Sequence, residues 1–165
     1  MLQRLLNTRD EVSLTIMRIV LAVCIFPHGA QKMLGWFGGH GLAASMDIFV
    51  KAYHIPPALT ALAVCAEFFG SMLLVLGLLG RLGALGILVT MGTAAWQTYD
   101  HFGNFFMNWF GAQKGEGIEY HLLAGALALA LVIQGSGAFS LDRLLLRAAR
   151  KRPVEMPLQA GAQSA

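Results

Sequence analysis

Four stretches of this chain are apolar over nearly their whole length, at residues 12–34, 57–79, 82–99 and 118–133. A helix rises about 1.5 Å per residue, so about 20 apolar residues are needed to cross the hydrocarbon core of a bilayer. The first two stretches exceed that length, and the last two fall slightly short of it. The pattern predicts an all-α integral membrane protein in which residues 1–139 form a bundle of four transmembrane helices.

The overall composition also favours a membrane protein. Of the 165 residues, 56% are hydrophobic and 13% are charged, whereas a soluble domain carries about 25% charged residues. The formal net charge of +3 comes from the C-terminal region rather than from a folded basic face. It therefore favours contact with lipid head groups and argues against a nucleic-acid partner.

Lysine and arginine residues predict the orientation of the helices, because cytoplasmic loops carry more of them than exported loops do. Basic residues precede the first span, occupy the turn between the second and third, and follow the fourth: Arg4, Arg9, Arg81, Arg143, Arg147, Arg150, Lys151 and Arg152. The other two loops hold fewer: Lys32, Lys51 and Lys114. Both termini are therefore predicted to be cytoplasmic. Arg18 interrupts the first apolar stretch, which disfavours a cleaved signal peptide, and residues 8–11 match a capping box that would begin the first helix at Thr8.

Residues 140–165 are predicted to lie outside the bundle. In their first part, leucines recur at helical spacing beside arginines. This spacing suits a basic amphipathic helix lying on anionic lipid, and a stop-transfer run of charges explains the arginines equally well. After Pro153 the composition predicts a disordered cytoplasmic tail.

Two ionisable residues lie deep inside the predicted spans. Arg18 is about 9 Å from the cytoplasmic end of its helix, and Glu67 is about 15 Å from the outer end of its own. A cation near the bilayer centre costs roughly 2.5–3.5 kcal/mol, so it needs a partner. We predict that Arg18 and Glu67 form a structural ion pair, because a guanidinium can donate two hydrogen bonds to one carboxylate.

Four further ionisable residues fall within about two helical turns of the outer boundary, and we predict them to be catalytic: His28, Lys32, His101 and Glu119. Histidines and a carboxylate can relay protons, and a lysine can hold an anion. We predict no metal site, because no spacing places these residues and His121 on one helix face. Glu119 and His121, for example, are about 200° apart around a helix.

Aromatic residues flank this predicted pocket, and four of them are candidates for cofactor binding: Trp36, Phe37, Phe105 and Phe106. One interpretation is a lid over a flat apolar ligand such as a quinone head group. The other is an ordinary belt of aromatic residues at the membrane interface. The sequence leaves both open.

The chain resembles the DoxX family of small bacterial membrane proteins. The resemblance lies in five segments taken in order: the run from Arg18 through His28-Gly29-x-x-Lys32 to Gly-Trp-Phe-Gly-Gly, residues 66–70, residues 101–106, Glu119-Tyr120, and residues 135–142. It implies a four-helix protein of the inner membrane. It also implies a link to redox chemistry, since family members are associated with quinone-dependent thiosulfate oxidation and with complexes that handle oxidative or thiol stress.

Our leading hypothesis is a membrane subunit of a quinone- or sulfur-linked redox system, in which His28 or His101 exchanges protons with a quinone and Lys32 stabilises negative charge. The chain has no haem, flavin or iron–sulfur motif, so electrons would come from another subunit or directly from a substrate. Whether the chain is itself an enzyme stays open. The alternatives are a non-catalytic scaffold or chaperone for partner proteins, and a transporter of a small solute or protons. The expected partners are the lipid bilayer and either a second protein or another copy of this chain.

Overall fold

The computed structural model describes residues 5–150, and every regular element within that range is a helix. The elements are α2 (Val12–Leu34), α3 (Gly41–Ala52), α4 (Pro57–Leu76), α5 (Gly80–Phe102), α6 (Glu119–Gln134) and α7 (Leu141–Arg150). The prediction of an all-α protein is therefore confirmed. The disordered tail predicted after Pro153 lies outside the described residues.

The helix boundaries follow the apolar stretches, with differences that the backbone explains. α2 coincides with the first predicted span. α4 ends three residues earlier than its predicted span, because Gly77 and Leu79 adopt positive φ angles of 63° and 48° that turn the chain toward α5. α3 has no counterpart among the predicted spans, since it is short and carries polar residues on one side.

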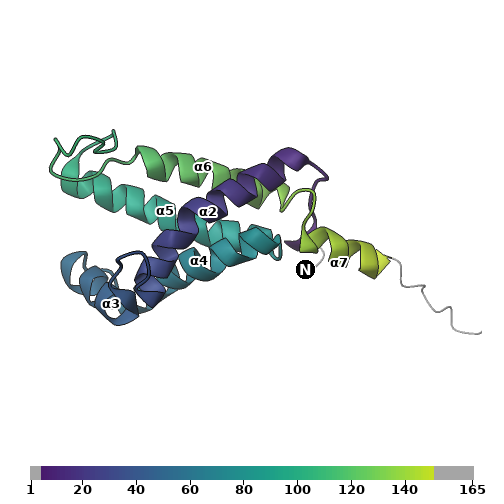
Figure 1. The fold of residues 1–165 in the computed structure, drawn as a ribbon, viewed down its shortest axis with the longest axis horizontal. Coiled ribbons are helices and arrows are strands. Elements are labelled where there is room, and N and C mark those ends of the chain that lie inside the picture. The colour runs from purple at the N-terminus through teal and green to yellow at the C-terminus, as the bar shows by residue number, and fades with distance from the viewer. Residues whose placement is uncertain (1–4, 151–165) are drawn as a thin grey trace, which may run out of the picture.

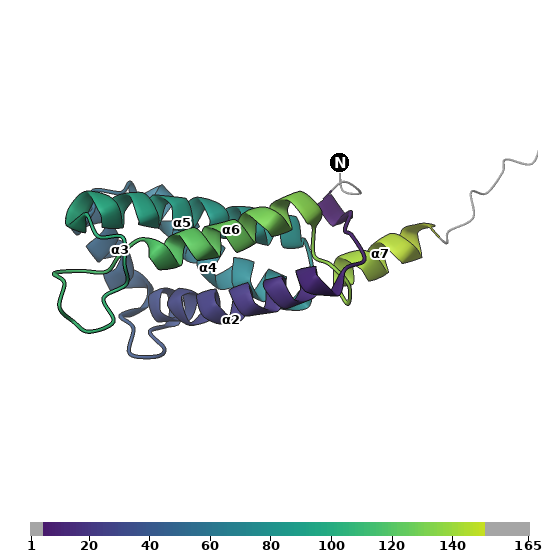
Figure 2. The same cartoon turned by 90° about the horizontal axis from the view of Figure 1, so that it is seen from above.

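The four long helices run side by side along the long axis of the molecule (Figures 1 and 2). α2 packs against α4 and α6, and α5 packs against α4 and α6. α3 lies across one end of this bundle, the same end as the loop of residues 103–118, and α7 extends beyond the opposite end. We refer to these as the α3 end and the α7 end.

The interior of the bundle combines aliphatic side chains with small and polar ones. The buried residues of α4, for example, include Thr60, Glu67 and Ser71. Large aliphatic side chains instead point outward from the same bundle: Val23, Leu62 and Val89 are 62%, 64% and 61% exposed. Small buried residues let helices approach closely, and outward aliphatic side chains suit a surface that faces lipid.

A close contact between two glycines brings α4 and α5 together. A Cβ atom built on Gly70 would lie 3.1 Å from the carbonyl oxygen of Gly83, and one on Gly83 would lie 2.9 Å from that of Gly70. Neither position accommodates a side chain without movement of the facing backbone. This contact fixes the separation of the two helices next to the cavity described below.

By length and composition, two of the described helices, α2 and α4, are apolar enough to cross a membrane on their own. α6 is apolar but has only 16 residues. α5 has 23 residues, and its second half carries hydroxyl and amide side chains. These polar positions on α5 face the cavity considered next.

Candidate ligand-binding cleft

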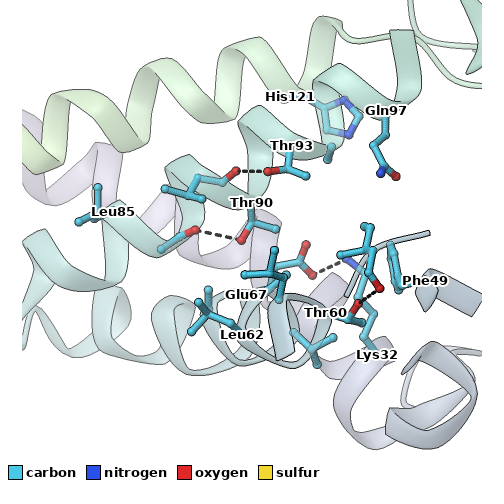
Figure 3. Close-up of a pocket in the computed structure, with 18 of the residues that line it drawn as sticks. Lys32, Phe49, Thr60, Leu62, Glu67, Leu85, Thr90, Thr93, Gln97 and His121 are labelled. Atoms are coloured by element: carbon cyan, nitrogen blue, oxygen red, sulfur yellow. Dashed lines mark hydrogen bonds and ion pairs between the residues drawn. The ribbon is translucent and has the colours of Figure 1, made fainter. Parts of the chain in front are cut away.

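A cavity of about 540 Å³ lies along the interface of α4 and α5 (Figure 3). Its volume falls within the range of about 300–1,000 Å³ that is typical of small-molecule sites. Most of its wall is aliphatic or aromatic: Phe49, Ile55, Leu59, Leu62, Ala63, Val64, Ala66, Leu82, Leu85, Val89 and Ala94. Several of these leucine and valine side chains are also exposed at the outer surface, so the cavity is a cleft that opens sideways from the bundle.

An ion pair lies at the inner side of this cleft. The Lys32 Nζ atom donates a hydrogen bond to the Glu67 Oε2 atom at 2.5 Å. The Glu67 side chain is 4% exposed and that of Lys32 is 26% exposed. Lys32 also lies 5.7 Å from the centre of the Phe49 ring, a cation–π contact that helps to hold the ammonium in an apolar setting. The pair therefore places charge against an otherwise apolar cavity.

Helix positions explain why these two residues meet. Lys32 is in the last turn of α2, and its long side chain reaches inward at the α3 end. Glu67 is buried on the face of α4 that packs against α2. The second carboxylate oxygen of Glu67, Oε1, receives no hydrogen bond from any described residue. It remains able to accept one from a ligand.

Further polar groups reach the cleft from α5 and α6. His121 of α6 lines it, and the Nδ1 atom of this side chain is buried with no hydrogen-bond partner in the part of the chain that the structure describes. The hydroxyl groups of Thr90 and Thr93 donate to carbonyl oxygens one turn earlier on α5, at 2.9 and 3.0 Å. Each hydroxyl oxygen can still accept a hydrogen bond.

α3 and the residues after it cover the cleft at the α3 end. Phe49 of α3 forms part of the wall. Tyr53 follows the helix and reaches α5, where its carbonyl oxygen accepts a hydrogen bond from the Gln97 side chain at 3.5 Å. The Tyr53 ring also lies 5.3 Å from the ring of His101.

The structure does not gather the four residues predicted to be catalytic. Lys32 alone among them lines the cleft. His28 is exposed, with its ring 5.9 Å from that of Tyr120. His101 is exposed and contacts the Gln97 carbonyl oxygen at 3.1 Å, and Glu119 accepts a hydrogen bond from the Met107 backbone at 3.4 Å. The prediction assumed that similar depth brings all four side chains together. His28 and Lys32 do share one side of α2, because they are four residues apart, but only Lys32 reaches the cleft.

The four predicted cofactor-binding aromatic residues also lie away from the cleft. Trp36 and Phe37 sit in the turn after α2, and Phe105 and Phe106 in the loop after α5. All four are at least half exposed, and none lines the cavity. They therefore form no lid over it, and their position at the α3 end suits the interfacial belt.

The predicted pair of Arg18 and Glu67 does not form. Arg18 is 2% exposed, and its guanidinium donates to the carbonyl oxygens of Leu74 at 2.6 Å, Val75 at 2.8 Å and Phe139 at 3.2 Å. The last carbonyl groups of a helix have no partner within it, so the C-terminal turn of α4 offers Arg18 ready acceptors. Glu67 lies seven residues before Leu74 in α4, about 10 Å along the helix. At that position the cation that pairs with Glu67 is Lys32 rather than Arg18.

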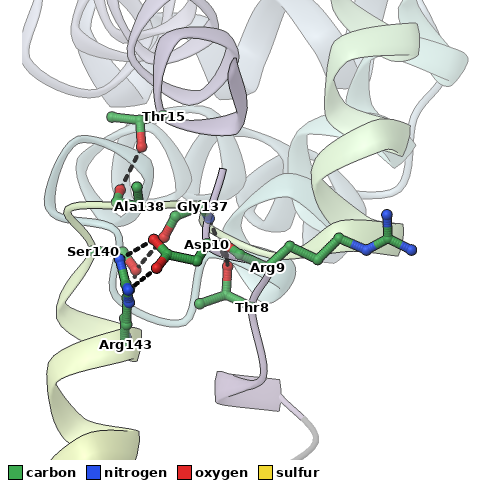
Figure 4. Close-up of polar contacts among 8 residues, drawn as sticks. All are labelled: Thr8, Arg9, Asp10, Thr15, Gly137, Ala138, Ser140 and Arg143. Carbon is green, nitrogen blue, oxygen red and sulfur yellow. Dashed lines mark hydrogen bonds and ion pairs between the residues drawn. The ribbon is translucent and has the colours of Figure 1, made fainter. Parts of the chain in front are cut away.

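The α7 end is closed by bonds between distant segments (Figure 4). The Asp142 carboxylate is buried and accepts hydrogen bonds from the backbone of Leu79 at 2.7 Å, the backbone of Gly80 at 3.1 Å and the Ser136 hydroxyl at 2.6 Å. Asp142 thus caps the start of α5. Thr8 is not the N-cap of α2 that the capping box predicted, because α2 begins after Glu11 and the Thr8 hydroxyl accepts from the Gly137 backbone at 2.6 Å.

Together, these features define the class of protein: a small helical membrane protein with a lateral apolar cleft that contains buried polar groups. A family model described as DoxX matches residues 13–100, which is more than half of the chain, and the chain belongs to the DoxX family. Lys32, Glu67 and the cleft-lining residues of α4 and α5 lie within the matched segment, whereas His121 lies beyond it. Comparisons with curated proteins and with solved structures gave no match.

Proposed function

We propose that the chain crosses the bacterial inner membrane four times, through α2, α4, α5 and α6, with both termini in the cytoplasm. Outward aliphatic side chains continue from α4 onto α5 and α6, which supports lipid contact around the whole bundle. Basic residues near the α7 end support a cytoplasmic location for that end: Arg9, Arg81, Arg143 and Arg147. A cysteine introduced at Phe110 should react with an impermeant reagent added outside, and one introduced at Ala149 should not.

We further propose that the cleft binds a quinone and that the protein is the membrane subunit of a redox system. The observation that carries this proposal is the combination of an apolar lateral cavity with Lys32, Glu67 and His121 among its lining residues. A quinone is an apolar ring with carbonyl oxygens, so it matches both parts of the site. The lateral opening would admit it directly from the bilayer, where quinones dissolve.

The residues of the cleft suit proton exchange with such a ligand. Reduction of a quinone to its quinol takes up electrons and protons in equal number, and a reduced sulfur substrate or a partner redox protein would supply the electrons. Lys32 and His121 would donate hydrogen bonds to the carbonyl oxygens, where negative charge develops as electrons arrive. Glu67 is placed to pass protons, because its carboxylate has an acceptor position left open beside the cavity.

Solvent extraction of the purified protein, followed by mass spectrometry, tests quinone binding. Ala63→Phe should displace the quinone, because Ala63 lines the cleft. Ala61→Phe adds the same ring to the same helix away from the cleft, so it is the matched control and should retain the wild-type amount. Equal retention in both variants, or no quinone in the wild type, would overturn the proposal.

A scaffold for partner proteins is the second candidate function. The observation that favours it is the exposed aromatic tip of the loop after α5, where Trp109 and Phe110 are 79% and 95% exposed. Two hydrogen bonds between Asn108 and Gln113, both 3.0 Å, hold this loop in shape. If docking is the function, Trp109→Ala with Phe110→Ala should abolish copurification of a partner while leaving the content of the cleft unchanged.

A further inference from the structure

A second cavity, of about 230 Å³, lies at the α7 end between the N-terminal segment and α7. It is lined by Asn7, Thr8, Arg143, Leu146 and Arg147. Unlike the cleft between α4 and α5, it is lined mainly by polar side chains and two of them are cations. Arg143 and Arg147 are four residues apart, so they lie on the same side of α7.

The charges around this cavity do not balance. Both terminal nitrogen atoms of the Arg143 guanidinium contact the carboxylate of Asp10 (Figure 4). Arg147 is exposed and has no acidic partner within residues 5–150. Two guanidinium groups therefore face one carboxylate, and one positive charge is left over. A ligand with a single negative charge would neutralise the group.

The walls of this cavity are held in place by the rest of the fold. The Asp142 backbone donates to the Gly77 carbonyl oxygen at 2.9 Å, which fixes the first turn of α7 to the end of α4. On the other side, Arg81 donates to the Asn7 carbonyl oxygen at 3.1 Å. Arg143 and Arg147 are thus presented by an anchored helix rather than by a free terminus.

The cavity also lies at the level expected for lipid phosphates. Asp10, the partner of Arg143, is two residues before the start of α2, so the cavity borders the end of the bundle rather than its apolar middle. Leucines on another side of α7 are exposed where this helix leaves the end of the bundle (Figure 1): Leu141, Leu144 and Leu145. Cations beside apolar side chains at a helix end match the head group and upper acyl chains of a phospholipid.

We propose that this pocket binds the phosphate group of an anionic phospholipid, with Arg147 as its principal cation. A phosphodiester carries one negative charge, which matches the excess charge of the pocket. The guanidinium of Arg147 can donate two hydrogen bonds to phosphate oxygens, and Asn7 can donate another through its amide. The exposed leucines of α7 then contact the acyl chains. The proposal does not depend on a redox role for the cleft.

The test compares two single-charge substitutions in the full-length protein. Arg147→Gln removes the unpaired cation of the pocket. Arg9→Gln removes a cation from the same end of the bundle, and the Arg9 side chain extends into solvent away from Arg143 and Asp10 (Figure 4). Neither change removes a hydrogen bond within the described residues other than the exposed contact of Arg9 with Glu11. Thermal denaturation of both variants serves as the folding control.

Binding of phosphatidylglycerol to the detergent-solubilised protein is measured by native mass spectrometry, with phosphatidylcholine as the neutral reference. Arg147→Gln should weaken phosphatidylglycerol binding about tenfold, as expected for loss of a charge-assisted hydrogen bond. Arg9→Gln should weaken it by no more than about fivefold, the effect of one basic residue near an anionic surface, and Arg147→Lys should recover part of the loss. Equal losses in the two glutamine variants would show diffuse attraction and overturn the proposal.

A competition experiment distinguishes binding of the lipid from binding of a soluble phosphate ester. Glycerol 3-phosphate at millimolar concentration should fail to displace phosphatidylglycerol, because it lacks the acyl chains that contact the α7 leucines. Displacement of phosphatidylglycerol by millimolar glycerol 3-phosphate would overturn the assignment to a lipid and indicate a soluble phosphate ester instead.

Discussion

Arg18 near the α7 end and Lys32 near the α3 end are both cations inside the bundle, but their surroundings differ. Arg18 is bonded to three backbone carbonyl oxygens at the end of α4 and after α6, and the pocket at that end does not include it. Lys32 is bonded to one carboxylate beside a large cavity. The structure leaves room for a ligand beside Lys32 and none beside Arg18, which is why we propose a binding site only at Lys32.

Substitution of Arg18 should have the largest effect on stability. Arg18→Met leaves three carbonyl groups without their donor in an apolar setting. Each unsatisfied acceptor costs about 1–3 kcal/mol, so we expect a loss of about 3–5 kcal/mol in the free energy of unfolding. Denaturant titration in mixed micelles measures this loss. Arg9→Met is the control, since Arg9 is exposed, and a loss for Arg18→Met no larger than that of the control would contradict the structural role.

Substitution of Lys32 should have a smaller effect on stability and a larger one on the cleft. Lys32→Met leaves the Glu67 carboxylate without a cation, but this carboxylate can take up a proton and become neutral, so the variant leaves one unsatisfied group rather than three. We expect a loss of about 1–3 kcal/mol in the same titration, together with loss of quinone from the purified protein. If Lys32→Met were as destabilising as Arg18→Met, the contrast between the two ends would be wrong.

Substitution of His121 should separate ligand binding from stability. The Nδ1 atom of His121 makes no hydrogen bond within the described residues, so His121→Phe should leave the melting temperature unchanged or raise it. Quinone affinity should fall about two- to tenfold, as expected for loss of one hydrogen bond. A fall in melting temperature without a change in quinone content would assign His121 a structural role instead.

Substitution of His28 or His101 should have the smallest effect. Both side chains are exposed and neither lines the cleft. His28→Ala and His101→Ala should therefore retain as much quinone as the wild type in the extraction assay. Loss of quinone from either variant would contradict the assignment to the cleft. It would instead support the pocket near the outer boundary that the sequence predicted.

The fold was predictable for a helix whose own sequence is a long apolar run. The apolar run of α2 is a local property of the sequence, whereas the end of α4 was predicted three residues too late. α3 was missed because an amphipathic helix of 12 residues resembles a polar loop when the search is for long apolar runs. A helix at that position bears on the proposed site, since Phe49 forms part of the cleft wall.

The site was less predictable because it depends on how the helices are rotated and aligned against each other. Counting residues from the helix ends placed Arg18 and Glu67 at similar depth, but it gave no information on which side chains compete for the same partner. Arg18 donates its hydrogen bonds to the free carbonyl groups at the end of α4, and Lys32 is the cation that pairs with Glu67. From the sequence, His121 was considered only as a metal ligand. That its Nδ1 atom is buried without a hydrogen-bond partner among the described residues depends on how α6 packs against the other helices, which the sequence does not reveal.

The acceptors of Arg18 bear on the order in which the protein is made. They lie 56, 57 and 121 residues later in the chain, so α2 is synthesised before any of them. We expect α2 to insert with its cation still hydrated near the cytoplasmic surface. We expect α2 to reach its final depth only after α4 has inserted. The hydrogen bond from Arg18 to the Phe139 carbonyl oxygen forms last, after Phe139 has been synthesised. Arg18 thereby makes the final position of the first helix conditional on synthesis of the last.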